Sequence, residues 1–482
     1  MIRHSQRSPC LFRTPFALQD LPVDILPPIL VQLSDRKDLH ACALVSKVFN
    51  RAATPLLYQT LDSRIISRSV VHHPATTLLQ RPQYAQYVRH VTETGAIHRG
   101  ALPRYAHITG DTLKALALCK NLESMTWVDD SSTTDSVLLS FLAVVRVHPL
   151  REISIRSHSD IGSAVWSELI TLTGLRKISI WCMEGPPRVL QGWSELLGST
   201  LTHLELGRCA GVPPTILISV LSQLPKLKDL RLKGAPAAAM PSILTCLPGL
   251  RSLDTEYPGA YYHRRPSARA TTDGISPPPP FPALRELTVR TSSMDSDGPT
   301  NLWSWIRELV PKPGLETFKL HAFVNNRDMG YHTGIPRIFL LDLARVQKTS
   351  LKHFMVGDAS LTLNGVAYLC SEFPNLETLV CSTASPNIKT IAETISSAKN
   401  LQTLRLDVQW IPNDPSVDDT NFTVQHAKNL MLRTEDSKLR AIAMGPTLYT
   451  GKWVLEEPKE EGQGGELRFQ VMPDFTKDRW QT

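Results

Sequence analysis

The sequence predicts an α/β protein in which a short helical motif is followed by a repeat solenoid, with a curved parallel sheet inside and helices outside. Two observations carry this prediction. Residues 18–58 contain two sets of apolar residues at helical spacing, and from residue 88 onward one apolar phrase recurs. The chain has 482 residues, of which 42% are apolar and 20% charged, so it can form a large folded core.

Residues 1–16 are expected to form a disordered basic arm. They contain Arg3, Arg7 and Arg13 and no acidic residue, and they lack the apolar stretch of a secretory signal. A transit peptide is the alternative. No run of about 18 apolar residues occurs, so we expect no membrane span. The eight cysteines are scattered without a Cys-x-x-Cys pair, which favours free thiols and an intracellular location, in the cytoplasm, the nucleus or both.

The helical motif occupies residues 17–60. Its first apolar set lies within residues 25–33, and its second follows the polar break 34–37 and extends from Leu39 to Ala52. About forty residues rarely bury that much apolar surface in a core of their own. The motif therefore predicts a protein partner.

This motif resembles the F-box, which docks substrate receptors onto the Skp-type adaptor of SCF ubiquitin ligases. The resemblance implies an adaptor-binding role for a set of residues that we take as Leu21, Pro22, Ile25, Leu26, Ile29, Leu33, Leu39, Val45, Ser46 and Phe49. Ser46 stands where the last helix needs an N-cap. Two features depart from the family pattern: Phe49 replaces a frequent Trp, and Pro27-Pro28 interrupts the first helix. Because proline is unfavourable inside a helix, we expect a kink or a late helix start at Pro27.

The body of the chain, residues 80–448, repeats one phrase in which apolar residues stand at the first, fourth and sixth positions. It begins thirteen times, at residues 88, 122, 150, 175, 201, 227, 250, 284, 315, 351, 376, 401 and 439. The shortest step, from 227 to 250, is 23 residues and the longest, from 401 to 439, is 38. This recurrence is typical of leucine-rich repeats, in which each short strand is followed by a helix.

The segments between the phrases fit that architecture. Helical apolar spacing is found at residues 135–147, 214–224, 301–310, 336–346, 387–398 and 422–433. Residues 258–282 are rich in Pro, Ser and Arg and predict a disordered insertion. In the final segment, 449–482, two apolar stretches flank an acidic turn and predict a hairpin that caps the sheet edge.

The net charge of +7 does not indicate a nucleic-acid partner. The arm contributes +3 and residues 258–282 contribute +2, whereas the repeat phrases place seven basic and seven acidic residues on the expected concave face. A mixed protein-binding surface is favoured. For a protein substrate we select Arg156, Trp181, Arg231, Lys233, Arg290, Lys319, His321 and Arg405, since Trp and Arg often anchor interfaces. The alternative is that Trp181 packs on its neighbours and the arginines are solvated.

No catalytic motif and no cluster of His or Cys ligands is recognisable, so we expect neither an enzyme nor a cofactor or metal, and we expect His72-His73 in a surface loop. The order of motifs resembles the F-box leucine-rich-repeat proteins. This resemblance implies a non-catalytic substrate receptor of an SCF-type ligase, bound to a Skp-type adaptor and through it to a cullin. The alternative is a scaffold that does not ubiquitinate.

Overall fold

The computed structural model describes residues 23–33, 35–63, 73–98, 107–129, 135–182, 190, 192–257, 281–291, 299–322, 334–411, 421–456 and 466–474. The predicted arm 1–16, the Leu21-Pro22 pair and residues 258–280 of the predicted insertion lie outside these residues. The chain divides into two compact units, Met1–Leu172 and Thr173–Thr482.

Unit 1 begins with a group of short helices. The 3-10 helix η2 (Val23–Ile25) leads into α1 (Leu26–Leu30), which is followed by α2 (Arg36–Val45) and α3 (Lys47–Leu57). Helix α1 starts at Leu26 with proline in its first turn, which confirms the late start expected at Pro27. The Ser46 hydroxyl accepts a hydrogen bond from the Phe49 amide at 3.3 Å, so Ser46 is the predicted N-cap of α3.

These helices do form a small core of their own, contrary to the expectation from length alone. Its buried members are Leu26, Leu30, Leu39, Ala43, Ala52 and Ala53. Three of the six are alanines, and the close approach of α2 and α3 depends on these small side chains. The core is therefore thin, and larger apolar residues are left outside it.

The rest of unit 1 is the start of the repeat. Strands β1 (Thr60–Asp62), β2 (His90–Thr94), β3 (Ser124–Asp129) and β4 (Glu152–Ser157) pair in parallel in sequence order. The helices between and after them are α4 (Pro74–Gln80), η3 (Pro82–Tyr87), α5 (Gly95–His98), α6 (Ile108–Leu118), α7 (Asp135–Val145) and α8 (Gly162–Ile170). Strand β1 precedes the first phrase that the sequence revealed.

Unit 2 continues the pattern in its own strands, which again pair in parallel in sequence order from β5 to β14. They are β5 (Lys177–Cys182), β6 (His203–Leu206), β7 (Asp229–Leu232), β8 (Ser252–Tyr257), β9 (Glu286–Thr291), β10 (Thr317–Ala322), β11 (His353–Leu361), β12 (Thr378–Ser385), β13 (Thr403–Trp410) and β14 (Ala441–Met444). Each of the thirteen phrases contains or leads into one strand from β2 to β14.

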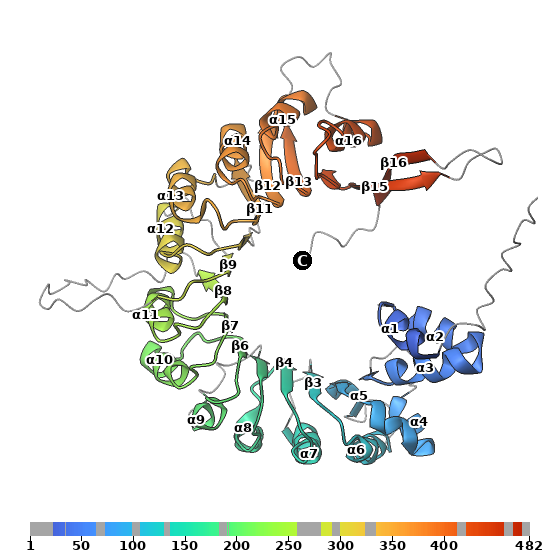
Figure 1. The fold of residues 1–482 in the computed structure, drawn as a ribbon. Helices are drawn as coiled ribbons and strands as arrows, with labels where there is room; N and C mark the ends of the chain where they lie inside the picture. Colours follow the sequence, from blue (N-terminus) through green and yellow to red (C-terminus); the bar gives the residue numbers. More distant parts are fainter. Residues whose placement is uncertain are drawn as a thin grey trace, which may run out of the picture. The chain divides into compact units, whose positions relative to one another are not determined.

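The helices of unit 2 lie on one side of its strands, as Figure 1 shows. They are α9 (Trp193–Leu197), α10 (Pro214–Ser222), η5 (Ala237–Ala239), α11 (Met240–Thr245), α12 (Pro299–Leu309), α13 (Arg337–Gln347), α14 (Leu363–Glu372), α15 (Ile388–Thr394) and α16 (Val424–Met431). The predicted helices correspond to α7, α10, α12, α13, α15 and α16. None of the described helices is long and apolar enough to cross a membrane.

The register explains why the phrase recurs. Leu230 pairs with Leu253, Leu253 with Leu287, and Leu287 with Phe318, so one apolar column continues from strand to strand. Burial alternates along β8 and β10, with every second side chain buried. The alternate, less buried side chains of the unit 2 strands form what we call the open face of unit 2.

The sheet of unit 2 changes direction at its carboxyl end. Strands β15 (Leu448–Glu456) and β16 (Glu466–Asp474) form an antiparallel hairpin, and β15 also pairs antiparallel with β14. The predicted terminal hairpin is therefore confirmed. Trp453 and Phe469 face each other across it, with ring centroids 5.1 Å apart.

Candidate functional site

The helices at the start of unit 1 expose an unusual amount of apolar surface. The side chains, with their exposed fractions, are Ile25 (40%), Ile29 (51%), Val31 (59%), Leu44 (73%), Val45 (60%) and Val48 (39%). We call these six residues the apolar patch. They come from η2, α1 and its C-cap, the last turn of α2 and the first turn of α3. A small three-helix unit gains no stability from leaving such residues in water, and exposed apolar side chains of this kind are typical of surfaces that contact a partner.

The patch only partly coincides with the set selected from the sequence. Ile25, Ile29 and Val45 are exposed, whereas Leu26 and Leu39 are buried in the small core. The prediction that Leu26 and Leu39 lie on the contact surface is therefore corrected, because both side chains belong to the core beneath it. Leu33 and Phe49 are half-buried against the same core, Ser46 acts as a cap, and Leu21 and Pro22 lie outside the described residues.

Three members of the patch, Val31, Leu44 and Val48, were absent from the predicted contact set. Leu44 and Val48 stand four residues apart, but Ser46 ends α2 and begins α3 between them, so helical periodicity does not relate them. The extended backbone of Ser46, with φ of −160°, reorients the chain at this point. The predicted N-cap at Ser46 already indicates that a new helix begins here, so helical spacing cannot be carried from one side of Ser46 to the other.

Comparison with known families agrees with this geometry. The model of the F-box-like family matches residues 18–64. Residues 18–64 are an F-box-like domain. In this chain the F-box-like domain is followed by an α/β repeat solenoid.

Comparison with whole chains adds a distant structural similarity. The search of curated proteins finds no match. Among solved structures, the chain is similar to one in the crystal structure of the Rad7 and Elc1 complex in yeast, with 14% sequence identity and a TM-score of 0.43. The similarity covers 83% of this chain and 92% of that one.

The open face of unit 2 contains a connected polar network that begins at Trp181 on β5. Its indole Nε1 donates to Oε1 of Glu205 on β6 at 2.5 Å, and Ser179 donates to Oε2 of the same carboxylate at 2.8 Å. The indole lies over Gly207, where an added Cβ would stand 2.9 Å from Trp181 Cδ2. A glycine is thus required for Trp181 to lie flat on the neighbouring repeat.

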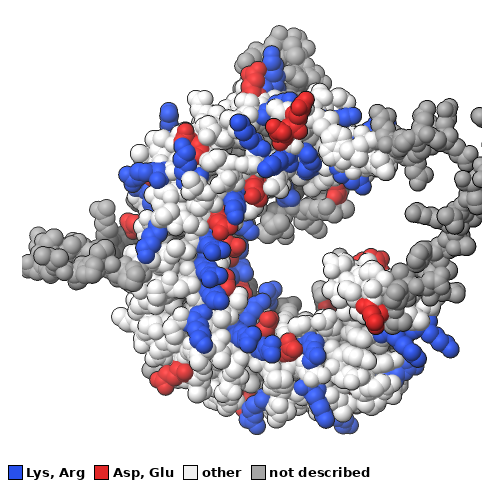
Figure 2. All heavy atoms as spheres, in the orientation of Figure 1, with Lys and Arg blue, Asp and Glu red and all other residues white. Residues whose placement is uncertain are grey.

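The network continues through two arginines. Arg231 on β7 contacts Glu205 Oε1 through Nη1 and Asp254 Oδ2 through Nε, both at 3.0 Å. Arg290 on β9 binds Asp254 with two hydrogen bonds, of 2.8 and 2.9 Å. Alternating acids and bases on successive strands thus neutralise one another. Figure 2 shows the corresponding alternation of blue and red along the strand side of unit 2.

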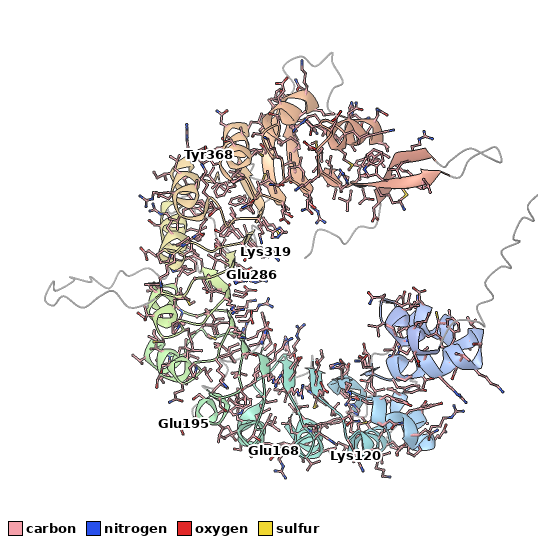
Figure 3. All side chains as sticks on the ribbon, viewed as in Figure 1. Lys120, Glu168, Glu195, Glu286, Lys319 and Tyr368 are labelled. Atoms are coloured by element: carbon pink, nitrogen blue, oxygen red, sulfur yellow. The ribbon has the colours of Figure 1, made fainter. Side chains whose placement is uncertain are left out.

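The other selected residues surround this network or lie apart from it. The Nζ of Lys233 and the guanidinium of Arg231 lie 5.1 and 5.4 Å from the Trp181 ring centroid. Lys319 and His321 are on β10, and Figure 3 shows Lys319 and Glu286 on the strand side, opposite Glu195 and Tyr368. Burial, with Arg290 nearby, lowers the pKa of His321. Arg405 is on β13 of unit 2, and Arg156 is exposed on β4 of unit 1.

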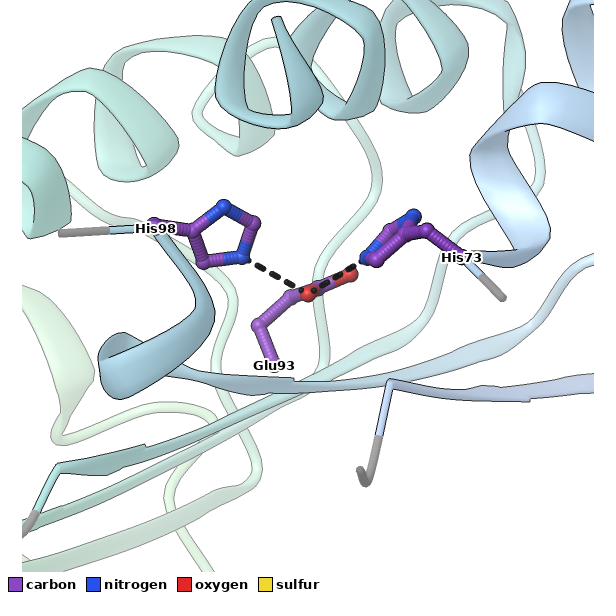
Figure 4. Close-up of side chains that lie close together, drawn as sticks. All are labelled: His73, Glu93 and His98. Atoms are coloured by element: carbon purple, nitrogen blue, oxygen red, sulfur yellow. Dashed lines mark hydrogen bonds and ion pairs between the residues drawn. The ribbon is translucent and has the colours of Figure 1, made fainter. Parts of the chain in front are cut away.

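A second polar cluster is buried in unit 1. Nε2 of His73 and Nε2 of His98 lie 3.2 and 3.0 Å from the same carboxylate oxygen, Oε2 of Glu93, as Figure 4 shows. All three residues are less than 10% exposed. The expected surface-loop position is therefore wrong for His73, and the expectation that no potential metal ligands gather is also wrong. His72 lies outside the described residues.

Sequence reasoning missed this cluster because its members are 20 and 5 residues apart and follow no ligand motif. Glu93 occupies a strand position where its neighbours Val91 and Thr92 are ordinary repeat residues. The signal that was available is the charge itself. Glu93 points to the side of β2 on which the repeat buries its apolar side chains, and a carboxylate there needs a polar partner.

Proposed function

We propose that the protein is a substrate receptor of an SCF-type ubiquitin ligase, in which the F-box-like domain binds a Skp-type adaptor and the open face of the repeats binds a target protein. The apolar patch is the observation that carries the adaptor half of this proposal. The receptor is non-catalytic and acts by proximity, because holding a target near the ubiquitin-conjugating enzyme raises the effective concentration of its lysines.

The energetics of the patch support a protein partner. Full burial of a large aliphatic side chain is worth about 1.5–3 kcal/mol, so a few patch residues supply a substantial share of a docking free energy. A charge placed at the centre of such a contact must be desolvated without a partner. Leu44 and Val45 are the best positions for that test, since they are 73% and 60% exposed and can change without disturbing the small core.

The proposal is tested by pulldown of the full chain with a purified Skp-type adaptor. Val45→Asp and Leu44→Asp should abolish capture, whereas the fold measured by circular dichroism stays the same. Ile338→Asp is the matched control, because Ile338 on α13 is also 60% exposed and lies in the other unit. Tight adaptor binding by Val45→Asp, or an equal loss with Ile338→Asp, would contradict the proposal.

The open face of unit 2 is proposed for the target because its network presents aromatic and charged groups in fixed positions. Arg231 is held by two carboxylates, so a partner meets a preorganised guanidinium that loses little side-chain entropy on binding. Trp181→Ala and Arg231→Ala should weaken capture of a target while adaptor binding persists. Unchanged capture by both variants would remove this face from the proposal.

Recruitment of a cullin separates the ligase from the scaffold that the sequence left as the alternative. Co-purification of adaptor and cullin with the full chain, and loss of both with Val45→Asp, is the result expected of a ligase receptor. Adaptor capture without cullin would identify the scaffold instead.

A further inference from the structure

We propose that His73, Glu93 and His98 form a binding site for one divalent transition-metal ion of the Zn²⁺ type, held by Nε2 of each histidine and by the Glu93 carboxylate. The site lies behind β2, between the N-terminus of α4 and the end of α5. It does not depend on the function proposed above.

The donor atoms have the spacing of a metal site. All three lie within 4.8 Å of one another, and both nitrogens lie 3.0–3.2 Å from the carboxylate oxygen. Zinc binds histidine nitrogen and carboxylate oxygen at about 2.0–2.2 Å, so neighbouring ligands around a tetrahedral ion are roughly 3.3 Å apart. Two histidines and one glutamate are a recurrent zinc donor set, with a fourth position for water.

The residues behind the histidines offer acceptors of the kind that metal ligation requires. A histidine that binds metal through Nε2 carries its proton on Nδ1 and donates it to an outer acceptor. Thr109 Oγ1 lies 3.4 Å from Nδ1 of His98, and Thr112 Oγ1 lies 3.3 Å from Nδ1 of His73. Each hydroxyl can donate its own proton to a backbone carbonyl, at 3.2 and 2.8 Å, which leaves its lone pairs for the imidazole.

The charge of the cluster points the same way. Glu93 is 1% exposed, and the two histidine nitrogens lie within hydrogen-bond distance of its Oε2. A buried carboxylate needs a cation. The His98 ring packs against Trp127 and Phe141, with centroids 5.9 and 4.8 Å away, and these apolar neighbours strengthen charge interactions near them.

One contact favours a competing arrangement in which hydrogen bonds join the three side chains and no metal is bound. The Ala75 amide donates to Nδ1 of His73 at 3.2 Å, and a nitrogen that accepts this bond carries no proton. In that arrangement His73 Nε2–H donates to Glu93 and cannot bind metal. Metal binding therefore requires His73 to exchange the Ala75 amide for the Thr112 hydroxyl, and the two arrangements differ in a measurable way.

The role that follows is a structural one. The ion would join the first residues of α4 to β2 and α5, directly after the F-box-like domain ends at residue 64. The burial of all three ligands leaves little access for a reacting molecule. Metal binding to such a site is coupled to folding, so the metal stabilises this part of unit 1.

The experiment uses the full chain, produced with Zn²⁺ and dialysed against metal-free buffer. Elemental analysis should find one Zn²⁺ per chain, and Co²⁺ in its place should give the visible absorption band of a tetrahedral site. Glu93→Gln and His98→Ala should lose the metal. His203→Ala should keep it, since His203 pairs with Asp229 at an exposed site in unit 2. Thr109→Val should weaken Co²⁺ binding by about 10–100-fold.

Absence of stoichiometric metal and of the Co²⁺ band in the wild-type chain would overturn the proposal and favour the hydrogen-bonded, metal-free arrangement. The same conclusion follows if Glu93→Gln and His98→Ala retain as much metal as the wild type. Should these variants fail to fold, the wild-type chain still decides, because Zn²⁺ must raise its Tm and a chelator must lower it. An unchanged Tm would count against the site.

Discussion

Gln347 offers a quantitative test of how neighbouring repeats are joined. It is fully buried at the end of α13, and its side chain bonds to the backbone that connects α12 to β10. Its Oε1 accepts from the amides of Gly314 and Leu315, both at 3.0 Å. Its Nε2 donates to the carbonyls of Lys312 and Val310, at 2.7 and 3.4 Å. One side chain thus satisfies four backbone groups.

Gln347→Leu keeps the volume of the side chain but removes all four hydrogen bonds. The bonds to Leu315 and Val310 are buried, and an unsatisfied buried backbone group costs about 1–3 kcal/mol. The free energy of unfolding should therefore fall by about 2–6 kcal/mol. Gln425→Leu on the exposed side of α16 is the matched control, for which a change within about 0.5 kcal/mol is expected.

Urea unfolding followed by circular dichroism measures the loss. Repeat proteins often unfold in parts, so amide hydrogen exchange should accompany it. The Leu315 amide should be protected in the wild type and exchange much faster in Gln347→Leu. A loss below about 1 kcal/mol, with Leu315 still protected, would show that water or rearranged backbone replaces the side chain and would refute the reasoning.

Glu93, Gly207 and Ser46 allow three further tests. The pKa of Glu93 in the folded protein is about 2, below the ordinary 4.5. Its contribution to stability is therefore present above about pH 4.5 and is lost as the pH falls towards 2. The acid unfolding curve of Glu93→Gln should lack this pH-dependent loss of stability. Gly207→Ala should lower the free energy of unfolding by about 1–3 kcal/mol, because the added methyl group clashes with Trp181. In a Trp181→Ala background the same change should cost much less, and an equal cost in both backgrounds would contradict the clash. Ser46→Ala should cost about 1 kcal/mol and Ser46→Asp much less; equal losses would exclude a cap.

The repeat was predictable because one physical requirement recurs along the whole chain. The fourth residue of a phrase, such as Leu230, Leu253 or Leu287, is buried in a column that continues from strand to strand. The spacing of these residues can therefore be recognised in the sequence before any contact is known. Strand β1 lacks a full phrase and was missed for that reason. Helix ends were predicted to within a few residues where Asp, Asn or Pro opened the helix.

The sites were less predictable because they depend on contacts between distant residues. Periodicity placed Leu26 and Leu39 on a helical apolar face, but it could not tell which part of that face the three helices bury among themselves. Arg231 was selected as a candidate anchor, whereas its two carboxylate partners depend on the register of three strands. His73 was misplaced because its partners Glu93 and His98 come from other elements.

The reversal of strand direction between β14 and β15 changes the edge that the sheet of unit 2 presents. A stack of parallel repeats has no intrinsic end, because the last strand presents the same hydrogen-bonding edge as every strand before it. The β15–β16 hairpin replaces that edge with antiparallel strands that belong to no repeat. The last described strand of unit 2 is therefore an antiparallel strand, β16, and any strand added beside it would meet a different hydrogen-bonding edge from that of a repeat.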